Sequence, residues 1–332
     1  MMTMTRRLAV GVDLGATNVR VAVGDEKGRI IARISDRTDK TRGPEGISLQ
    51  IERMIRRLQG EAAGKGEIKG IGIGSAGPLD LRKGCLIKPT NLPFDLVPLV
   101  EPLEDAFHLP TYLLNDCSTA VMGERFFGAG KKHENLAYIT ISTGIGGGVY
   151  VDGHLLVGKD GNAVEIGHFT IDFEGRLTCG CGKRGHWEAY CSGSGIPNYV
   201  RLLLSEAQGS RVEESLLMRR VNGDLSLVTA KTLYECAKAG DPVSLEIVEK
   251  IGFLNSVGFA CVVDAYDPSL ITVGGSIALK NEDLVIAPIR RGVGEHAMNR
   301  VPEIRITPLG GDIVLYGALA MVFHPEEGRC GR

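Results

Sequence analysis

The spacing of apolar residues divides the first 36 residues of the chain into three predicted strands. Residues 8–15, LAVGVDLG, form a continuous apolar run that ends in Asp-Leu-Gly, and residues 18–25, NVRVAVGD, alternate between apolar and polar positions. Residues 26–29, EKGR, are typical of a turn, and residues 30–36, IIARISD, resume an apolar pattern. We therefore expect an antiparallel meander of three strands at the start of the fold.

A helix and further strands follow this meander. Residues 45–59 carry apolar side chains at helical spacing with a basic outer face, and residues 68–78, IKGIGIGSAGP, predict a buried strand that ends in small residues. A helix near residues 97–107 and a strand at 111–116, TYLLND, come next. Because a meander that leads into strand–helix–strand units contains both pairing directions, we expect a mixed sheet.

The second half of the chain opens in a similar way. Residues 135–156, NLAYITISTGIGGGVYVDGHLL, predict a strand, a glycine turn, a strand, a short turn and a strand. Further predicted elements are helices around residues 195–206, 230–239 and 242–265, a buried strand at 269–276, and a helix at 310–323. Two halves that begin alike favour a duplicated lobe with a cleft between the copies over a single Rossmann sheet.

Composition narrows the class of protein. The chain has 332 residues, which is too long for one small core and favours two lobes. Hydrophobic residues make up 43% and charged residues 23%, and 38 basic against 40 acidic side chains give a net charge of -2. This balance indicates neither a nucleic-acid nor a membrane partner. Without a run of about 18 apolar residues or a signal peptide, we expect a cytoplasmic protein with reduced cysteines.

Two glycine-containing turns are candidates for phosphate binding. In DLGATNVR (Asp13–Arg20), Gly15 lets backbone N–H groups approach a polyanion, while Asp13 could hold a hydrated Mg²⁺. STGIGGG (Ser142–Gly148) has the same character, but neither a Walker Gly-Lys-Ser/Thr nor a helix follows it. Each turn alone is equally compatible with a plain hairpin. As a pair, they suggest two phosphate-clamping turns that face one cleft.

Other short stretches are candidates for binding a ring and a sugar. GGS (Gly274–Ser276) ends a predicted buried strand, so a flat ring could approach its backbone, although an ordinary strand-to-helix turn would look the same. Asp116 lies where a strand gives way to a helix, in NDCSTAVMGE, and is either a helix N-cap or a general base. Asn115 beside it could hydrogen-bond a polyol, and EIGH (Glu165–His168) could place two polar groups on one side of a turn.

Taken together and in this order, these stretches resemble the ROK family, which groups bacterial and archaeal sugar kinases with related repressors. The resemblance covers essentially the whole chain. It implies an α/β protein with the actin-like ATPase (ribonuclease H-like) fold, related to hexokinase, in which two lobes with mixed sheets enclose a deep cleft. On this basis we expect a small lobe of residues 1–117 plus 308–332, and a large lobe of residues 118–307.

The resemblance also implies roles for individual residues. Asp116 is expected to be the base that deprotonates the 6-hydroxyl of the sugar. The residues expected to bind or line the sugar are Gly77, Thr90, Asn91, Asn115, Asp116, Glu165, His168 and Glu188. Those expected to bind the nucleotide are Asp13, Gly15, Ala16, Thr17, Asn18, Arg20, Thr143, Gly144, Gly274 and Gly275.

The chain departs from the family pattern at two positions. The family usually has a small residue before the glutamate of the sugar motif, where this chain has Val164. We expect this change to alter the backbone near the 1- and 2-positions of the sugar. The family pattern Cys-x-Cys-Gly-x-x-Gly-Cys-x-Glu has a third cysteine, where this chain has His186.

The stretch CGCGKRGHWEAY (residues 179–190) predicts a structural zinc site. Its Cys-x-Cys spacing disfavours a Cys-x-x-Cys redox pair. Together with His168, the side chains of Cys179, Cys181 and His186 make a Cys2His2 set suited to tetrahedral Zn²⁺. A site with four protein ligands needs no open position, so we expect a structural role for the metal. The site would hold Glu188 close to His168 and Glu165 of the sugar motif. Because an imidazole replaces a thiolate, the site is one charge less negative than the family's.

The sequence thus predicts an ATP- and Mg²⁺-dependent kinase that phosphorylates the 6-hydroxyl of a hexose. We favour glucose as the substrate, with N-acetylglucosamine, N-acetylmannosamine or allose as alternatives. A non-catalytic sugar sensor or a repressor is disfavoured, because no helix-turn-helix fits before Leu8 and the candidate base is present. The resemblance leads us to expect a homodimer or a homotetramer.

Overall fold

The computed structural model describes residues 6–89, 92–206 and 210–327 of the chain. Its first sheet has the strand order β3-β2-β1-β4-β8. The strands are β1 (Arg7–Leu14), β2 (Asn18–Asp25), β3 (Ile30–Arg37), β4 (Glu67–Ser75) and β8 (Thr111–Asn115). Strands β1, β2 and β3 pair antiparallel, while β1, β4 and β8 pair parallel. The predicted meander and the predicted mixed sheet are confirmed.

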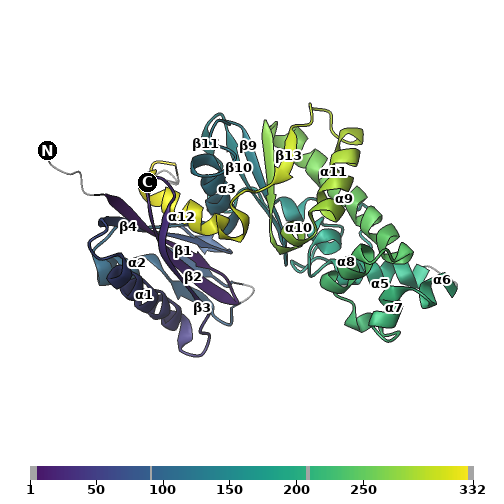
Figure 1. Cartoon of the computed structure of the whole chain (residues 1–332), viewed down its shortest axis with the longest axis horizontal. Helices are drawn as coiled ribbons and strands as arrows, with labels where there is room; N and C mark the ends of the chain where they lie inside the picture. The colour runs from purple at the N-terminus through teal and green to yellow at the C-terminus, as the bar shows by residue number, and fades with distance from the viewer. Residues whose placement is uncertain (1–5, 90–91, 207–209, 328–332) are drawn as a thin grey trace. The chain divides into compact units, whose positions relative to one another are not determined.

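Helix α1 (Gly43–Ala62) packs on one face of this sheet (Figure 1). Its buried side chains recur every three or four residues, as helical periodicity requires, and include Ile47, Ile51 and Ile55. Alternate residues of β1, such as Val10 and Val12, belong to the same hydrophobic cluster. The even positions of β1 therefore face α1, and the odd positions are left for the opposite face.

Helices α3 (Asp116–Phe126) and α12 (Ile313–Phe323) lie on that opposite face (Figure 1). Glycines allow the backbone of α12 to approach β4 and α3 closely. A Cβ atom placed on Gly72 of β4 would lie 2.0 Å from the carbonyl oxygen of Ala318. One placed on Gly317 of α12 would lie 1.6 Å from the carbonyl oxygen of Thr119 in α3. Because both clashes are with backbone, a side chain at either position would push α12 away from its neighbours.

We expect Gly317→Ala to lower the free energy of unfolding by about 2–3 kcal/mol, at the upper end of the usual cost of overpacking. The matched control is Gly60→Ala near the end of α1, where a Cβ would meet nothing within 4 Å. At position 60 the change should raise the free energy of unfolding by about 0.5–1 kcal/mol, because alanine is the better helix former. Denaturant unfolding of both variants checks the pair, and equal effects would contradict the packing described for α12.

A small second sheet, of order β5-β6-β7, corrects one prediction. Its strands are β5 (Leu79–Asp80), β6 (Cys85–Ile87) and β7 (Leu96–Pro98). The helix predicted from residue 97 begins later, as α2 (Val100–Phe107), because residues 96–98 pair antiparallel with β6. Pro98 suits this place, since β7 is an edge strand that needs fewer N–H donors.

The third sheet has the strand order β11-β10-β9-β12-β13. Its strands are β9 (Leu136–Ile141), β10 (Ile145–Val151), β11 (His154–Leu155), β12 (Leu270–Gly274) and β13 (Glu303–Ile306). The predicted strand–turn–strand–turn–strand pattern and the buried strand β12 are confirmed. Strand β13 pairs parallel with β12 and was not predicted.

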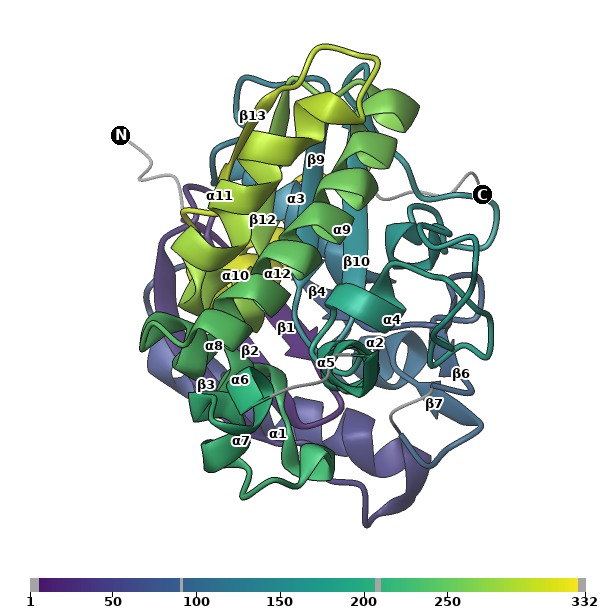
Figure 2. The same ribbon diagram turned by 90° about the vertical axis from the view of Figure 1, so that its right-hand side faces the viewer.

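The predicted helices of the second half are α5 (Ile196–Glu206), α8 (Ala230–Lys238) and α9 (Pro242–Tyr266). Helix α9 packs against α8 and against α11 (Glu282–Gly292). Figure 2 shows α9 and α11 side by side. Shorter helical segments are α4 (Glu188–Cys191), α6 (Ser210–Glu213), α7 (Leu216–Arg220), α10 (Ser276–Lys280) and the 3₁₀ turns η1 (Ile166–His168), η2 (Leu225–Leu227), η3 (Val293–Glu295) and η4 (Gly310–Asp312).

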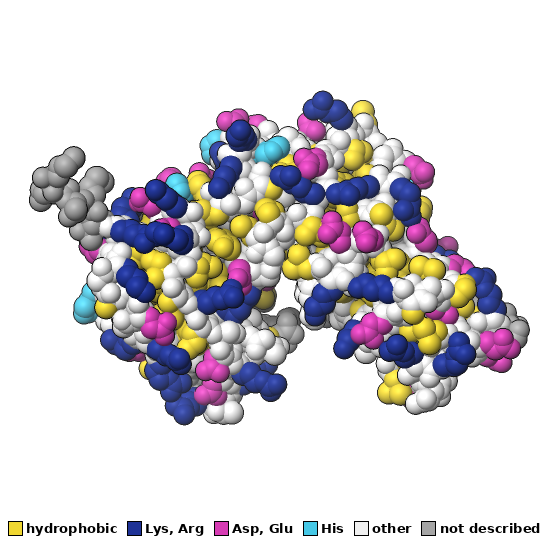
Figure 3. All heavy atoms as spheres, viewed as in Figure 1, with side chains coloured by type: hydrophobic (Ala, Val, Ile, Leu, Met, Phe, Trp, Pro, Cys, Tyr) yellow, Lys and Arg dark blue, Asp and Glu magenta, His cyan; other side chains and the backbone are white. Residues whose placement is uncertain are grey.

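The chain divides into two compact units. The first comprises Met1–Tyr138, Gly148–Val164 and Thr307–Arg332, and the second comprises Ile139–Gly147 and Glu165–Ile306. The lobe boundaries expected at 117/118 and 307/308 stay a prediction. Among the described residues, no helix combines the length and the apolar character needed to cross a bilayer. Basic and acidic side chains are interspersed over the face drawn in Figure 3.

Candidate functional site

In the first unit, the turn between β1 and β2 is closed by backbone hydrogen bonds. The N–H of Gly15 donates to the carbonyl oxygen of Asn18 at 2.9 Å, and Thr38, just beyond β3, donates its hydroxyl to the carbonyl of Gly15 at 2.7 Å. The N–H of Thr38 also donates to the carbonyl of Thr17 at 3.0 Å. The predicted phosphate turn is therefore a braced backbone loop that includes Ala16.

Asp13 and Arg20 face each other from adjacent strands, because they are paired residues in the β1–β2 register. Arg20 Nε donates to Oδ2 of Asp13 at 2.8 Å, and Nη2 contacts the same oxygen. Burial raises the pKa of the Asp13 carboxyl above its ordinary value, and the charge and hydrogen bonds of Arg20 oppose this shift. Among described residues no hydrogen bond reaches Oδ1, so this carboxylate has the hard oxygen donor that a hydrated Mg²⁺ requires.

Asn115 and Asp116 lie where β8 ends and α3 begins, as predicted. The side chain of Asn115 caps the helix by accepting from the N–H of Cys117 at 2.8 Å, and Asp116 Oδ1 accepts from the same N–H at 2.8 Å. Both side chains are half-buried. Gly77 lies beside them, since a Cβ atom there would be 3.8 Å from Nδ2 of Asn115. Thr90 and Asn91, also expected to line the sugar, lie outside the described residues.

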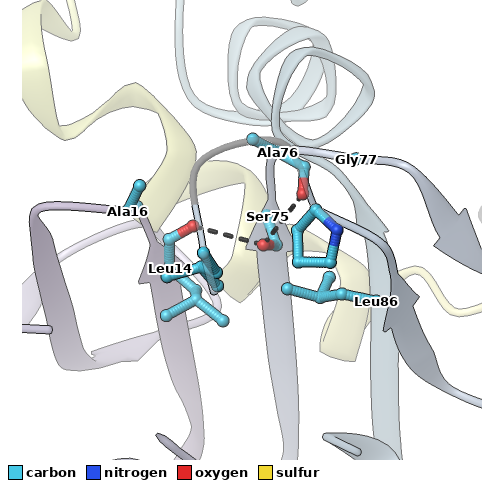
Figure 4. A pocket seen from close by; sticks show the side chains of 9 residues that line it. Leu14, Ala16, Ser75, Ala76, Gly77 and Leu86 are labelled. Atoms are coloured by element: carbon cyan, nitrogen blue, oxygen red, sulfur yellow. Dashed lines mark hydrogen bonds between the residues drawn. The ribbon is translucent and has the colours of Figure 1, made fainter. Parts of the chain in front are cut away.

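A small hollow in the first unit lies between the β1–β2 turn and Gly77. Figure 4 shows the hydroxyl of Ser75 between the carbonyl oxygens of Leu14 and Ala76, at 3.2 and 3.3 Å. The lining residues are Leu14, Gly15, Ala16, Ser75, Ala76, Gly77, Leu86, Pro89 and Leu92. The volume of about 20 Å³ suits roughly one water molecule. The hollow is therefore too small to hold a hexose by itself.

In the second unit, the turn that starts at Ser142 is braced by two other segments. The N–H of Gly193 donates to the carbonyl of Ser142 at 2.7 Å, and the N–H of Ser194 donates to the carbonyl of Thr143 at 3.1 Å. The hydroxyls of Ser142 and Ser276 lie 3.1 Å apart. Since Ser276 follows Gly274 and Gly275, the second predicted phosphate turn and the predicted adenosine turn meet here.

Glu188 makes a contact that the sequence did not predict. Its Oε2 accepts a hydrogen bond from the backbone N–H of Ile145 at 2.9 Å, and Oε1 lies 3.7 Å from the sulfur of Cys179. A Cβ atom on Gly144 would lie 2.5 Å from Oε2, so glycine at this position leaves room for the carboxylate. Glu188 thus joins the predicted phosphate turn at Ser142 to Cys179.

Glu165 precedes η1 and His168 ends it, and this single turn brings their side chains together, as their spacing predicted. Oε2 of Glu165 lies 3.8 Å from Nε2 of His168, and burial raises the pKa of the Glu165 carboxyl above its ordinary value. The other ring nitrogen of His168, Nδ1, lies 3.7 Å from the sulfur of Cys179. One imidazole therefore has a carboxylate at one nitrogen and a thiol at the other.

Val164, which departs from the family pattern, adopts a conformation that valine rarely takes. Its φ angle is +64°, in the left-handed region that favours glycine. Its side chain is nevertheless buried, with 8% exposure. A strained backbone of this kind costs on the order of 1–3 kcal/mol, which is similar to the 1.5–3 kcal/mol or so that burying a valine side chain contributes.

We therefore expect Val164→Gly to change the melting temperature by only a few degrees, because relief of backbone strain offsets the lost burial. The matched control is Val21→Gly in β2, where a fully buried valine lies in a regular strand. This change should lower the free energy of unfolding by about 3 kcal/mol or more. Thermal unfolding of the two variants tests this difference. A loss at Val164 as large as that at Val21 would contradict the assigned strain.

The four side chains predicted to bind zinc converge in the second unit. The ligand atoms of His168, Cys179, Cys181 and His186 all lie within 4.8 Å of one another. The sulfur of Cys181 lies 3.3 Å from Nδ1 of His186, and tetrahedral Zn²⁺ would need separations of roughly 3.3–3.8 Å. Burial lowers the pKa of His186, which favours the neutral imidazole that a metal needs, and raises the pKa of Cys179 to about 12. The donor set fits zinc, whose binding must displace the thiol protons.

The ROK family model matches residues 9–323 of the chain. The chain belongs to the ROK family. Among its ROK relatives, it is 36% identical to a glucokinase of Pyrobaculum calidifontis, over 96% of each protein. Its fold is similar to that of the ROK hexokinase of Thermus thermophilus, with a TM-score of 0.78, 30% identity and coverage of 96% and 99% of the two chains. It is also similar to a ROK glucokinase of Streptomyces griseus in complex with glucose and AMPPNP, with a TM-score of 0.75, 31% identity and coverage of 95% and 98%. These likenesses bear out the expected actin-like ATPase fold.

Proposed function

We propose that this chain is an ATP-dependent glucose kinase that phosphorylates the 6-hydroxyl of the sugar. The observation that carries the proposal is its similarity, over 95% of its length, to a ROK glucokinase that binds glucose and AMPPNP. The sequence identity of 31% with that enzyme and of 36% with the Pyrobaculum glucokinase supports the same reaction. ATP with Mg²⁺ follows from this class of reaction.

The proposed base is Asp116. In phosphoryl transfer the protein mainly aligns the reactants and neutralises charge, and the attacking hydroxyl loses its proton late. A carboxylate at the start of α3 is held by the N–H of Cys117 and favoured by the helix dipole. We propose that it orients the 6-hydroxyl and accepts its proton.

The two braced turns supply the proposed phosphate contacts. Backbone N–H groups of the β1–β2 turn and of the turn at Ser142 would bind phosphate oxygens, as such nests do. Asp13 would hold the hydrated Mg²⁺, which when bound neutralises charge on the transferring phosphoryl group. Gly274 and Gly275 would lie against the adenosine, since they lie at the end of β12 next to Ser276, whose hydroxyl lies 3.1 Å from that of Ser142.

The proposed sugar contacts are Asn115 and Gly77 in the first unit, and Glu165, His168 and Glu188 in the second. Support comes from their placement: each set is gathered at the end of a strand or turn next to a phosphate turn of its own unit. Hydroxyl groups are recognised by such carboxylate, amide and imidazole groups. Thr90 and Asn91 stay predictions.

We also propose a structural Zn²⁺ held by His168, Cys179, Cys181 and His186. His168 would bind through Nδ1, and its Nε2 would stay on the side of Glu165. The metal would fix the loop that presents Glu188, whose carboxylate already touches Cys179. The closeness of the four ligand atoms supports this proposal.

Coupled measurement of ADP formation with a panel of hexoses tests the proposed substrate. Glucose should give the highest kcat/KM, with mannose, fructose, allose, N-acetylglucosamine and N-acetylmannosamine below it. A higher kcat/KM for an N-acetylated sugar would replace glucose in the proposal. A rate that no sugar raises above the background of ATP hydrolysis would contradict the kinase function itself.

The expected oligomer, a homodimer or a homotetramer, is part of the same proposal and rests on the family resemblance. Light scattering during gel filtration should give twice or four times the chain mass of 35.6 kDa. A mass equal to one chain would overturn it.

A further inference from the structure

Asp312 has the position of a helix cap but does not cap its helix. It ends η4 and directly precedes α12, and no side-chain hydrogen bond from it reaches the first turn of α12. An aspartate at this position ordinarily accepts from the second or third N–H of the helix. Its carboxylate is instead used elsewhere.

Both oxygens of Asp312 are paired with arginines from the first sheet. Oδ1 accepts from Nη1 of Arg20 in β2 at 3.1 Å, and Oδ2 is paired with Nη1 of Arg33 in β3. The side chains of Arg20 and Asp312 are 30% and 29% exposed, so the contact is partly screened from solvent. A residue at the start of the last helix is thus tied to Arg20, 292 positions earlier in the chain.

Arg20 is shared between two carboxylates. Its Nε and Nη2 contact Oδ2 of Asp13, whereas its Nη1 is taken by Asp312. When a guanidinium and a carboxylate have no competing partners, they commonly form two parallel hydrogen bonds, one to each carboxylate oxygen. Here Arg20 contacts a single oxygen of Asp13, and Oδ1 accepts from none of the described residues.

We propose that Asp312 is a positioning residue for nucleotide binding. By holding Nη1 of Arg20, it keeps the guanidinium from pairing with both oxygens of Asp13 and so leaves Oδ1 for hydrated Mg²⁺. This inference rests on the proposed function, in which Asp13 holds the metal. Loss of Asp312 would let Arg20 pair with both oxygens of Asp13.

The test is calorimetric binding of AMPPNP at a series of Mg²⁺ concentrations, which does not depend on turnover. For Asp312→Ala, the Mg²⁺ concentration that gives half-maximal nucleotide affinity should rise roughly three- to tenfold, as expected for one lost charge-assisted contact at a partly exposed site. Asp312→Glu should restore part of the wild-type value. The matched control is Asp36→Ala, which removes an exposed carboxylate of β3. Among the described residues this carboxylate accepts from the N–H of Arg37 alone, so the change should leave the Mg²⁺ dependence unchanged.

A double variant separates positioning from mere stabilisation. Lysine at position 20 cannot form the two-oxygen pair, so adding Asp312→Ala to Arg20→Lys should change the Mg²⁺ dependence by less than about twofold. Two contrary results would overturn the inference: an unchanged Mg²⁺ dependence in Asp312→Ala, even with a lower melting temperature, or an equal shift in both backgrounds. Wild-type protein that binds no AMPPNP at any Mg²⁺ concentration would instead contradict the proposed function.

Discussion

Replacing Asp116 by asparagine is expected to lower kcat for glucose by roughly two to four orders of magnitude, the usual contribution of a positioned acid–base group. The substitution removes the base but keeps an oxygen that can accept from the N–H of Cys117, so α3 should begin as before. Dissociation constants for glucose and for AMPPNP should change by less than about fivefold, because the reacting group acts mainly in the transition state. Steady-state kinetics and calorimetry measure the two effects separately.

The control for Asp116→Asn is Asp224→Asn. Asp224 also stands at the start of a helical turn, where it accepts from the N–H of Ser226 at 2.8 Å, and it belongs to no proposed site. Its replacement should leave kcat unchanged. If Asp116→Asn retained kcat within tenfold of the wild type, Asp116 would not be the base.

Removal of one ligand from the cysteine cluster is expected to have the second largest effect. Cys181 is exposed, so Cys181→Ser should fold, but it should retain far less than one zinc per chain. Zinc present at a hundredfold excess over its dissociation constant stabilises the folded state by about 2.7 kcal/mol, so the melting temperature should fall by several degrees. Because the loop that carries Glu188 loosens, KM for glucose should rise roughly ten- to hundredfold.

Cys261→Ser is the matched control, since Cys261 is a partly exposed thiol that lies outside the cluster. It should keep the metal content, melting temperature and KM of the wild type. His186→Cys, which restores the family pattern, should bind zinc at least as tightly. Elemental analysis and thermal unfolding test the set, and wild-type protein purified without chelators that holds no zinc would refute the metal site.

Sequence patterns predicted the long elements well because each is long enough to show a pattern. Helix α1 is amphipathic, the meander β1–β3 has clear apolar runs between turns, helix α9 is a long run of mostly apolar residues, and all were predicted within a few residues. The strands of the small sheet, two or three residues each, are too short to show a period. Helix α11 was missed because Pro288 stands inside it and looks like a break, and β13 has only four residues.

The candidate site could be predicted only as positions, and not as contacts. The spacing of Cys179, Cys181 and His186 indicated a group of metal-ligating side chains, and these side chains do converge with His168. The hydrogen bond from Ile145 to Glu188 joins residues 43 positions apart, and no local pattern signals it. The link between Arg20 and Asp312 is longer still, and the positive φ angle of Val164 contradicts the preference of its own side chain.

The central claim, phosphoryl transfer from ATP to the 6-hydroxyl of glucose, is tested most directly by identifying the product. Purified protein incubated with ATP, Mg²⁺ and glucose should yield ADP and glucose 6-phosphate in equal amounts, as phosphorus and carbon NMR spectra can show. With 6-deoxyglucose in place of glucose, which lacks the attacking hydroxyl, no sugar phosphate should form. Phosphate on another carbon of glucose, or ADP formed without any sugar phosphate, would contradict the account.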